Sequence, residues 1–475
     1  MDTLLNGSDT AKEGMCYQAL KVSAFLFDIR RRYGMAVVRP FKAVRPAPEA
    51  VSKVASLPYD VYSREEAAAA VRGKPLSFLN IDRPETMFEP DHDMYAPEVY
   101  EAAADRFKSQ KRDGVYITEK KACYYIYELT MEGRTQTGIA ALSSVDDYLN
   151  GVCRRHENTV ESKELDRIRH VDVMSAQTGP IFLAYHSRDN INVIVAGWKE
   201  AQKPVYDFVS EDGIRHRVWV IDDDEVISKL NKLFEGLEAT YIADGHHRAA
   251  SAVKVALKRR KEALDNGRPD ENAEYNYFLS VLFPDSELKI YDYNRVVRDI
   301  NGLTKDGFLT ALSDIYDIRR LAPGQQALKE DAGALRPVRK YDVGLYLAGE
   351  AYMLSLKDEI KKQVSGDPVK SLDVSVLQDH VLSPILGIRD PRTDKRIEFI
   401  GGIRGMYELI ARADKYTGEN AGNEALCGKG PAAAFAMYPT SIGELLNVAD
   451  AGLLMPPKST WFEPKLRSGL FIHEI

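Results

Sequence analysis

The chain has 475 residues, more than one hydrophobic core normally supports, so we expect two or three domains. With 64 Lys and Arg against 71 Asp and Glu, the net charge is −7, which argues against a protein dedicated to binding nucleic acid. The four cysteines form no CxxC pair and no apolar run reaches about 18 residues, which disfavours a disulfide framework, a cysteine zinc site and a membrane span, and favours a cytoplasmic protein.

In the first half of the chain, helices are interleaved with a hairpin and a strand–turn–helix. Residues 1–34 are interpreted as an N-terminal extension, because Met35 begins a second, better start. In chain order, we expect a helix after the capping box Ser63–Glu66, a helix over 97–111, a hairpin of strands 123–129 and 136–142, a strand over 218–221, a helix over 222–234, a strand over 239–243 and a helix over 246–264. The inner face of that last helix is expected to carry Ala249, Ala252, Val253, Ala256 and Leu257.

The second half mixes strands and helices without strict alternation. In chain order, we expect strands over 277–283 and 288–297, a helix over 308–316, a hairpin over 343–356, a helix over 372–386, a strand over 435–438 and a helix over 445–449 after the capping box Ser441–Glu444. Such an order predicts an α+β fold rather than a doubly wound sheet.

The sharpest motif is Asp244-Gly245-His246-His247-Arg248, at the junction of a strand and a helix. Gly245 permits a tight turn, the backbone N–H groups at the helix start favour an anion, and Arg248 can bind phosphate through two hydrogen bonds. Because Asp244 would repel phosphate, its expected role is to hold a divalent metal or to accept a hydrogen bond from a substrate hydroxyl. The alternative is an aspartate that caps the helix, followed by two surface histidines.

A second group of polar residues runs from Arg154 to Thr159 and continues with Lys163, Asp166, Arg167 and His170. This density of donors, acceptors and imidazole suits a pocket for a charged substrate, although a solvated charged face is an equal alternative. His156 and Glu157 hint at a metal site, but they lack the HExxH spacing of zinc enzymes.

Three further segments carry weaker signals. Leu57–Val61, at the expected end of a strand, either aims Asp60 into a cleft or makes a simple turn. The loop Met455–Lys465 has two lysines and two hydroxyl residues, so it either covers an anionic ligand or acts as a structural strap. Gly401–Gly405 lacks the spacing of phosphate-binding loops and is predicted to be a turn.

Together these motifs resemble the ParB/sulfiredoxin-related family known as domain of unknown function 1015, from Met35 onward. The matching residues are Arg39-Pro40-Phe41, Arg45-Pro46, Pro58–Val61, His156–Thr159, Asp166-Arg167, Ile242–Arg248, Asn294–Val297, Pro457–Thr460 and Phe462–Gly469. The resemblance implies a ParB/sulfiredoxin-like nucleotide-binding region over 35–265. It also implies an additional mixed α/β region over 275–475, closed by the loop of Lys458, Ser459 and Thr460.

The Asp-Gly-His-His-Arg turn is also similar to that of free serine kinases of the same superfamily. This similarity implies that Gly245, His246, His247 and Arg248 bind ATP or ADP with magnesium, together with Lys458, Ser459 and Thr460. The position of His246 holds the catalytic cysteine in sulfiredoxins, so sulfinic-acid reduction is not expected. ParB-like centromere binding is not expected either, given the acidic balance and the lack of a recognisable helix-turn-helix.

Phosphoryl transfer needs a phosphate cradle, a metal held by carboxylates and a carboxylate near the accepting hydroxyl. The expected parts are Gly245 to Arg248 for the cradle, Asp244 for the metal, and either Glu49 or Asp60 as the base. His156, Glu157, Asn158, Thr159 and Arg167 would bind an amino-acid substrate. The sequence therefore predicts a kinase for a small hydroxyl substrate, with free L-serine as the leading candidate. The alternative is a nucleotide-binding, ParB-like regulatory protein without phosphoryl transfer.

Overall fold

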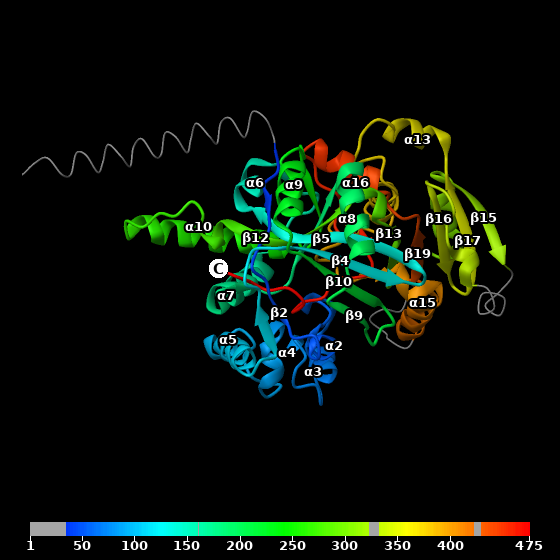
Figure 1. Cartoon of the computed structure of the whole chain (residues 1–475). Coiled ribbons are helices and arrows are strands. Elements are labelled where there is room, and N and C mark those ends of the chain that lie inside the picture. The colour runs from blue at the N-terminus through cyan, green and yellow to red at the C-terminus, as the bar shows by residue number, and fades with distance from the viewer. Residues whose placement is uncertain (1–34, 160, 323–331, 422–428) are drawn as a thin grey trace, which may run out of the picture. The chain divides into compact units, whose positions relative to one another are not determined.

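The computed structural model describes residues 35–159, 161–322, 332–421 and 429–475, so the expected extension over 1–34 lies outside the described residues. The chain forms two compact units (Figure 1). The first unit contains the chain up to Arg154, then Thr159–Glu287 and the C-terminal segment Leu466–Ile475. The second contains Arg155–Asn158 and Leu288–Lys465.

A nine-stranded mixed sheet forms the centre of the first unit (Figure 1). Its strands, in spatial order, are β6 (Cys153–Arg154), β11 (Thr240–Asp244), β8 (Ile181–Tyr185), β12 (Tyr277–Pro284), β5 (Arg134–Ser144), β4 (Tyr124–Met131), β10 (Arg215–Ile221) and β9 (Tyr206–Val209), with β1 (Val38–Arg39) paired to β5. Strand β11 runs parallel to β6 and antiparallel to β8, and β12 runs parallel to β8. The expected hairpin of β4 and β5 is confirmed, as is the mixed α+β class.

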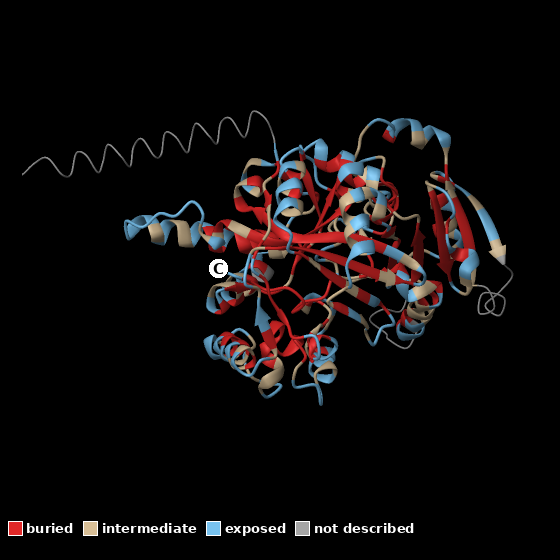
Figure 2. Ribbon diagram, in the orientation of Figure 1, coloured by how far each residue is buried: buried red, intermediate tan, exposed pale blue. Residues whose placement is uncertain are grey.

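Helices α6 (Val145–Asn150), α8 (Asp189–Ala201), α9 (Asp224–Phe234) and α10 (His246–Asp265) accompany this sheet. The hydrophobic core joins sheet residues such as Leu183 and Ile242 to Phe234 of α9 and Val253 of α10. The expectation that Leu257 faces this core is wrong, since its side chain is 43% exposed. No residue of α10 beyond Ala256 is buried, and the far end of the helix extends past the sheet into solvent (Figure 2).

A second group of short elements in the first unit surrounds its own hydrophobic cluster. These elements are α2 (Val51–Val54), the 3-10 turn η1 (Tyr59–Val61), α3 (Arg64–Ala70), α4 (Leu79–Asp82), η2 (Pro84–Met87), α5 (Pro97–Arg112) and α7 (Glu161–Met174), with the strand pairs β2 (Val44–Pro46) with β3 (Tyr116–Thr118) and β7 (Ala176–Gln177) with β21 (His473–Glu474). The capping box at Ser63 is confirmed. The strand expected before Tyr59 is not present: Ser56 makes only an isolated bridge to Ser468, and the chain then turns through η1.

The second unit has a six-stranded antiparallel sheet. Its strands, in spatial order, are β15 (Tyr316–Ala322), β17 (Glu350–Leu356), β16 (Asp342–Leu347), β19 (Ala433–Met437), β14 (Tyr293–Val297) and β18 (Ile397–Gly401). Helix α15 (Gly405–Ala421) packs against it through Leu409 and Ala413. The other elements are the 3-10 turns η3 (Glu274–Asn276) and η4 (Asp285–Glu287) of the first unit, and η5 (Ala332–Leu335), η7 (Gly402–Arg404), α11 (Lys305–Ser313), α13 (Asp358–Val364), α14 (Asp373–Leu377), α16 (Ile442–Asp450) and the pair β13 (Ile290–Tyr291) with β20 (Trp461–Phe462) of the second.

Three expectations for the second unit need correction. The strand expected over 288–297 divides at Asp292, whose buried carboxylate accepts hydrogen bonds from Arg336 and Asn294, so β13 and β14 enter different sheets. The helix expected to reach Tyr316 ends at Ser313. The helix expected over 372–386 is regular only to Leu377 and continues as a single π turn, Gln378–Leu382. Over the described residues, no helix is long and apolar enough to cross a membrane.

Candidate active site

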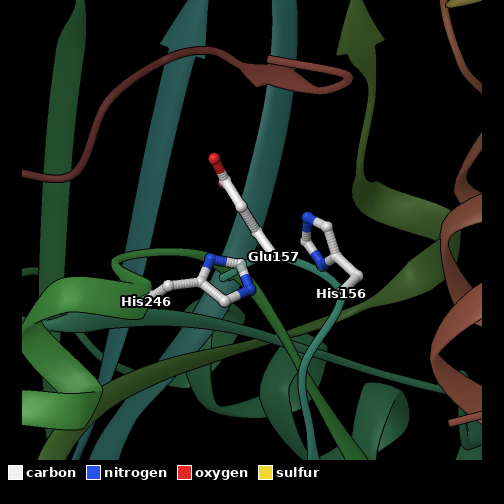
Figure 3. A group of neighbouring side chains, drawn as sticks. All are labelled: His156, Glu157 and His246. Atoms are coloured by element: carbon white, nitrogen blue, oxygen red, sulfur yellow. The ribbon is translucent and has the colours of Figure 1, made fainter. Parts of the chain in front are cut away.

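The predicted strand–turn–helix is present as β11, Gly245 and α10. Gly245 has φ 94° and ψ 30°, the left-handed region that favours glycine. It occupies the cap position of α10, and the Asp244 carboxylate accepts a hydrogen bond from the Gly245 amide at 2.9 Å. The alternative of an aspartate cap with two surface histidines is therefore wrong, because Asp244 precedes the cap and His246, which lies in the first turn of the helix (Figure 3), is buried.

The side chain of Arg248 folds back over this turn. A Cβ atom placed on Gly245 would lie 3.1 Å from the Arg248 guanidinium, and one on Gly179 would lie 3.5 Å from Cδ of the same side chain. Nη1 of Arg248 donates to the carbonyl oxygen of Pro180, and Nη2 lies 3.9 Å from the Asp244 carboxylate. Nη1 is thus committed to the backbone, which leaves Nε and Nη2 for the phosphate contacts that the sequence predicts.

Helix α7 carries Arg167, the residue of the charged segment that is most firmly held. Its guanidinium forms an ion pair with Asp166 at 2.8 Å, donates to the carbonyl oxygen of Asp82 at 3.1 Å, and lies 4.1 Å from the centroid of the Tyr59 ring. Arg167 and His170 are both buried. A purely solvated face is therefore wrong for this part of the segment, because one side of α7 faces the protein interior.

Burial and charge set the protonation of these groups. Burial raises the pKa of the Asp166 carboxyl, but the Arg167 guanidinium and a hydrogen bond from the Tyr100 hydroxyl outweigh it, so the net shift is downward. Burial, helped by the charge of Arg167, lowers the pKa of His170, whose Nε2 donates to the carbonyl oxygen of Ile81. Asp166 is therefore ionised and His170 neutral at pH 7.

Two neighbouring cavities of the first unit share Tyr59 and Arg167 in their walls. The smaller has a volume of about 30 Å³ and is also lined by Arg248 and Ser468. The larger has a volume of about 210 Å³ and is also lined by Asp60. Arg248 of the predicted phosphate turn thus lines one cavity, and Asp60, a predicted base, lines the other. Tyr59 and Arg167 lie between them, in the walls of both cavities.

The two candidate bases differ in their surroundings. Glu49 is exposed on the loop before α2 and lines neither cavity. Asp60 lies in η1, a turn that Arg83 holds through hydrogen bonds to the carbonyl oxygens of Tyr59 at 3.0 Å and Tyr62 at 2.7 Å. Arg83 is itself paired with the buried carboxylate of Glu85 at 2.5 Å. This geometry favours Asp60 over Glu49.

The other predicted residues lie in the second unit, apart from Thr159, which belongs to the first. His156 and Glu157 follow β6 (Figure 3), and His156 is buried whereas Asn158 is exposed. The carbonyl oxygen of His156 accepts from the Met455 amide at 2.8 Å, and its Nε2 lies 3.5 Å from Oγ1 of Thr460. The second unit thus joins two motifs that are some 300 residues apart in the chain.

The Lys458-Ser459-Thr460 loop has a fixed backbone. Lys458 adopts a positive φ of 60°, and its carbonyl oxygen accepts from Arg295 at 3.0 Å. The Ser459 hydroxyl donates to the carbonyl oxygen of Pro456 at 2.6 Å, and the Ser459 carbonyl accepts from Thr440 at 3.0 Å. The loop therefore keeps its shape through contacts inside the second unit.

Within either unit, the described residues include no set of three His, Cys, Asp or Glu side chains close enough to enclose a metal. Magnesium does not require such a set, since one or two carboxylates with substrate phosphates and water commonly bind it. A single carboxylate such as Asp244 is compatible with that mode of binding. Its role as a metal ligand stays a prediction.

Several residues around the two cavities were not predicted from the sequence, namely Asp82, Arg83, Glu85, Tyr100 and Thr178. A signal was present in Asp82-Arg83-Pro84-Glu85, where three charges surround a proline between apolar segments. Such a run is common on protein surfaces. Only the fold shows that all three charged side chains are buried.

Comparison with solved structures gives distant matches. A free serine kinase in complex with AMP has a TM-score of 0.29 and 14% identity, covering 68% of this chain and 86% of the kinase chain. SbnI with a C-terminal truncation, from Staphylococcus aureus, has a TM-score of 0.33 and 10% identity, covering 68% and 82%. A conserved hypothetical protein from Pyrococcus furiosus has a TM-score of 0.28 and 14% identity, covering 70% and 93%. At these TM-scores, the matches carry no functional argument.

Among curated proteins, the comparison finds no match. Residues 38–375 match the family described as "Protein of unknown function (DUF1015)". This match spans well over half of the chain and confirms the family to which the motifs pointed. The chain belongs to the DUF1015 family.

Proposed function

We propose that the protein is a kinase that transfers a phosphoryl group from ATP or ADP, with magnesium, to a small hydroxyl substrate, with free L-serine as the first candidate. The observation that carries the proposal is the placement of Arg248 and Asp60 in two cavities that share Tyr59 and Arg167. One side offers a phosphate cradle and the other an exposed carboxylate beside a cavity of about 210 Å³. We further propose that the first unit contains the ParB/sulfiredoxin-like nucleotide-binding region expected over 35–265. The additional mixed α/β region expected over 275–475 is narrower than predicted, because β12 and Leu466–Ile475 belong to the first unit and the second unit takes Leu288–Lys465.

The phosphates of the nucleotide would bind at the turn between β11 and α10. Gly245 brings the chain into the helix without a side chain in the way, so the first amides of α10 and the positive end of its dipole are available to an anion. Nε and Nη2 of Arg248 would donate further hydrogen bonds to the phosphates, because its guanidinium lies next to Gly245. A magnesium ion bound by Asp244 would neutralise negative charge on the phosphates.

Asp60 would act as the general base. Its carboxylate accepts the proton of the substrate hydroxyl while the hydroxyl oxygen forms a bond to the terminal phosphorus. The bond from that phosphorus to its bridging oxygen breaks, and the leaving nucleotide keeps the electron pair. Arg83 fixes the backbone of the turn that carries Asp60, so this turn does not have to form when the substrate binds.

We also propose roles for the remaining residues that the sequence predicts. Within the first unit, Arg167 is proposed to contact the phosphoryl acceptor from the cavity wall that it shares with Asp60. His156, Glu157, Asn158 and Thr159 keep the acceptor-binding role that the sequence predicts for them. Lys458, Ser459 and Thr460 are proposed to bind the nucleotide. The ordered loop around Ser459 and its contact with His156 support a role for both motifs within one unit.

The test is direct. Purified protein is incubated with ATP or ADP, magnesium and a panel of amino acids and other small alcohols, and the products are identified by mass spectrometry. A phosphorylated acceptor that depends on Asp60 supports the kinase. Tight nucleotide binding without a phosphorylated product from any acceptor would instead favour the regulatory protein.

A further inference from the structure

The cavity beside Asp60 has an unusual balance of charge. Its walls contain three carboxylates and two guanidinium groups, which leave one net negative charge. The lining is completed by Pro84, Met94 and four tyrosines, Tyr59, Tyr62, Tyr95 and Tyr100. A carboxylate-lined cavity rich in aromatic rings is the chemistry that proteins use to bind ammonium groups.

The two cations in the wall are already engaged. Arg83 pairs with Glu85 through Nε and donates to two backbone carbonyl oxygens through Nη1. Arg167 pairs with Asp166 through Nε and Nη2 and donates to the carbonyl oxygen of Asp82 through Nη1. All three nitrogens of Arg167 have partners, so binding a substrate carboxylate there would cost a buried interaction. At Arg83, two of the three nitrogens are engaged in the same way, and its charge is matched by the buried carboxylate of Glu85.

Unlike the carboxylates of Glu85 and Asp166, which pair with these arginines, the third carboxylate of the cavity has no such partner among the described residues. Asp60 is exposed, and its side chain forms no ion pair or hydrogen bond with any residue that the structure describes. A positively charged substrate group would be attracted by the net charge of the cavity, whereas a carboxylate would be repelled. The volume of about 210 Å³ accommodates a small organic molecule but not a nucleotide.

We propose that this cavity binds an amino alcohol, a small molecule with a hydroxyl and an ammonium group and no carboxylate. The inference rests on the proposed kinase, in which the cavity holds the phosphoryl acceptor, and it narrows the small hydroxyl substrate to an amino alcohol in place of free L-serine. Its hydroxyl faces Asp60, and its ammonium group lies among the tyrosines and carboxylates. The transfer itself is the one described above: the hydroxyl oxygen bonds to phosphorus and its proton passes to Asp60.

L-Serine and L-serinamide form a matched pair of probes, because they differ only in that an amide replaces the carboxylate. Their affinities for the intact protein are measured by calorimetry in the absence of nucleotide, so that binding is read separately from catalysis. We expect L-serinamide to bind at least fivefold more tightly than L-serine, and D-glycerate, which has a carboxylate and no ammonium group, to show no measurable binding. Turnover of each compound is then measured with nucleotide and magnesium.

A variant that adds a free cation to the wall provides the decisive comparison. Met94 is only partly buried, so Met94→Lys should fold, and it should shift the affinity ratio at least fivefold toward L-serine. Val193→Lys is the matched control, since Val193 is 71% exposed on α8 and lies outside this cavity. Its ratio should equal that of the unmodified protein.

Tighter binding of L-serine than of L-serinamide by the unmodified protein would overturn the proposal, as would an unchanged ratio in a folded Met94→Lys protein. The proposed function fails in a different way. If L-serinamide binds as expected and no compound is phosphorylated, the cavity assignment stands and the kinase does not. If only L-serine is bound and phosphorylated, the kinase stands and the amino alcohol does not.

Discussion

The guanidinium carbon of Arg167 lies 4.1 Å from the centroid of the Tyr59 ring, which joins helix α7 to the turn that carries Asp60. Both side chains also line the two cavities of the first unit. Burial, although opposed by the charge of Arg167, raises the pKa of the Tyr59 hydroxyl, so the phenol stays neutral at every physiological pH. The contact is therefore a cation–π interaction between the neutral ring of Tyr59 and the permanently charged guanidinium of Arg167.

Arg167→Ala is expected to destabilise the protein by about 3 kcal/mol, because it leaves the Asp166 carboxylate without its cation and removes the packing on Tyr59. Arg215→Ala breaks an ion pair with Asp207 that is largely exposed and screened by water, so its effect on the free energy of unfolding should be much smaller. Urea denaturation of both variants checks this difference. Equal losses of unfolding free energy would contradict the structural role assigned to Arg167.

Arg248→Ala is expected to weaken nucleotide binding about tenfold or more, because a charge-assisted donor contributes about 1.5–3 kcal/mol. Gly245→Val should weaken it too, since the left-handed backbone disfavours a branched side chain and the added Cβ would press on Arg248. Calorimetric titration with ATP and ADP measures both effects, with Arg215→Ala as the control. Unchanged affinity in both folded variants would remove this turn from the nucleotide site.

The pH dependence of stability should report on His216, which is fully buried. Burial, together with the charge of Arg467, lowers its pKa from 6.5 to about 3. Arg467 donates to Nε2, so Nδ1 carries the proton and donates to the Tyr127 hydroxyl. Below about pH 6.5 the unfolded chain therefore binds a proton at His216 that the folded protein does not bind. The free energy of unfolding is highest above this pH and decreases as the pH falls toward 3.

His216→Gln keeps an acceptor for Arg467 and cannot be protonated. Between pH 6.5 and 4, the unmodified protein should lose about 1.4 kcal/mol per pH unit more than this variant. Urea denaturation at pH 7.0, 5.5 and 4.5 measures the difference, and His186→Gln, at an exposed side chain, is the control. Parallel curves for the unmodified protein and His216→Gln would show that His216 is protonated in the folded state.

Local patterns predicted much of the secondary structure. The capping boxes at Ser63 and Ser441, the hairpin of β4 and β5, and the turn from β11 into α10 all follow from residues close together in the sequence. These signals are physical properties of one turn or one helix end. They did not depend on the tertiary structure, which is why they could be read from the sequence.

The environment of each side chain could not be read in this way. Leu257 has the right spacing for the core face of α10, yet that part of the helix runs beyond the sheet. Arg83 and Glu85 resemble surface charges in the sequence, but they form a buried pair that supports the turn of Asp60. The sequence likewise left both Glu49 and Asp60 as candidates for the base, because only the tertiary fold determines which of them borders a cavity.

That choice gives the sharpest test of the proposed chemistry. Asp60→Asn should reduce turnover about 100-fold or more, since a general base contributes about 10²–10⁴ to the rate, while nucleotide affinity changes little. Glu49→Gln is the matched control and should change turnover less than twofold, because Glu49 is exposed and lines neither cavity. Product formation is followed by mass spectrometry and nucleotide binding by calorimetry. If Glu49→Gln abolished turnover and Asp60→Asn did not, Glu49 would be the base and the cavity beside Asp60 would not hold the reacting hydroxyl.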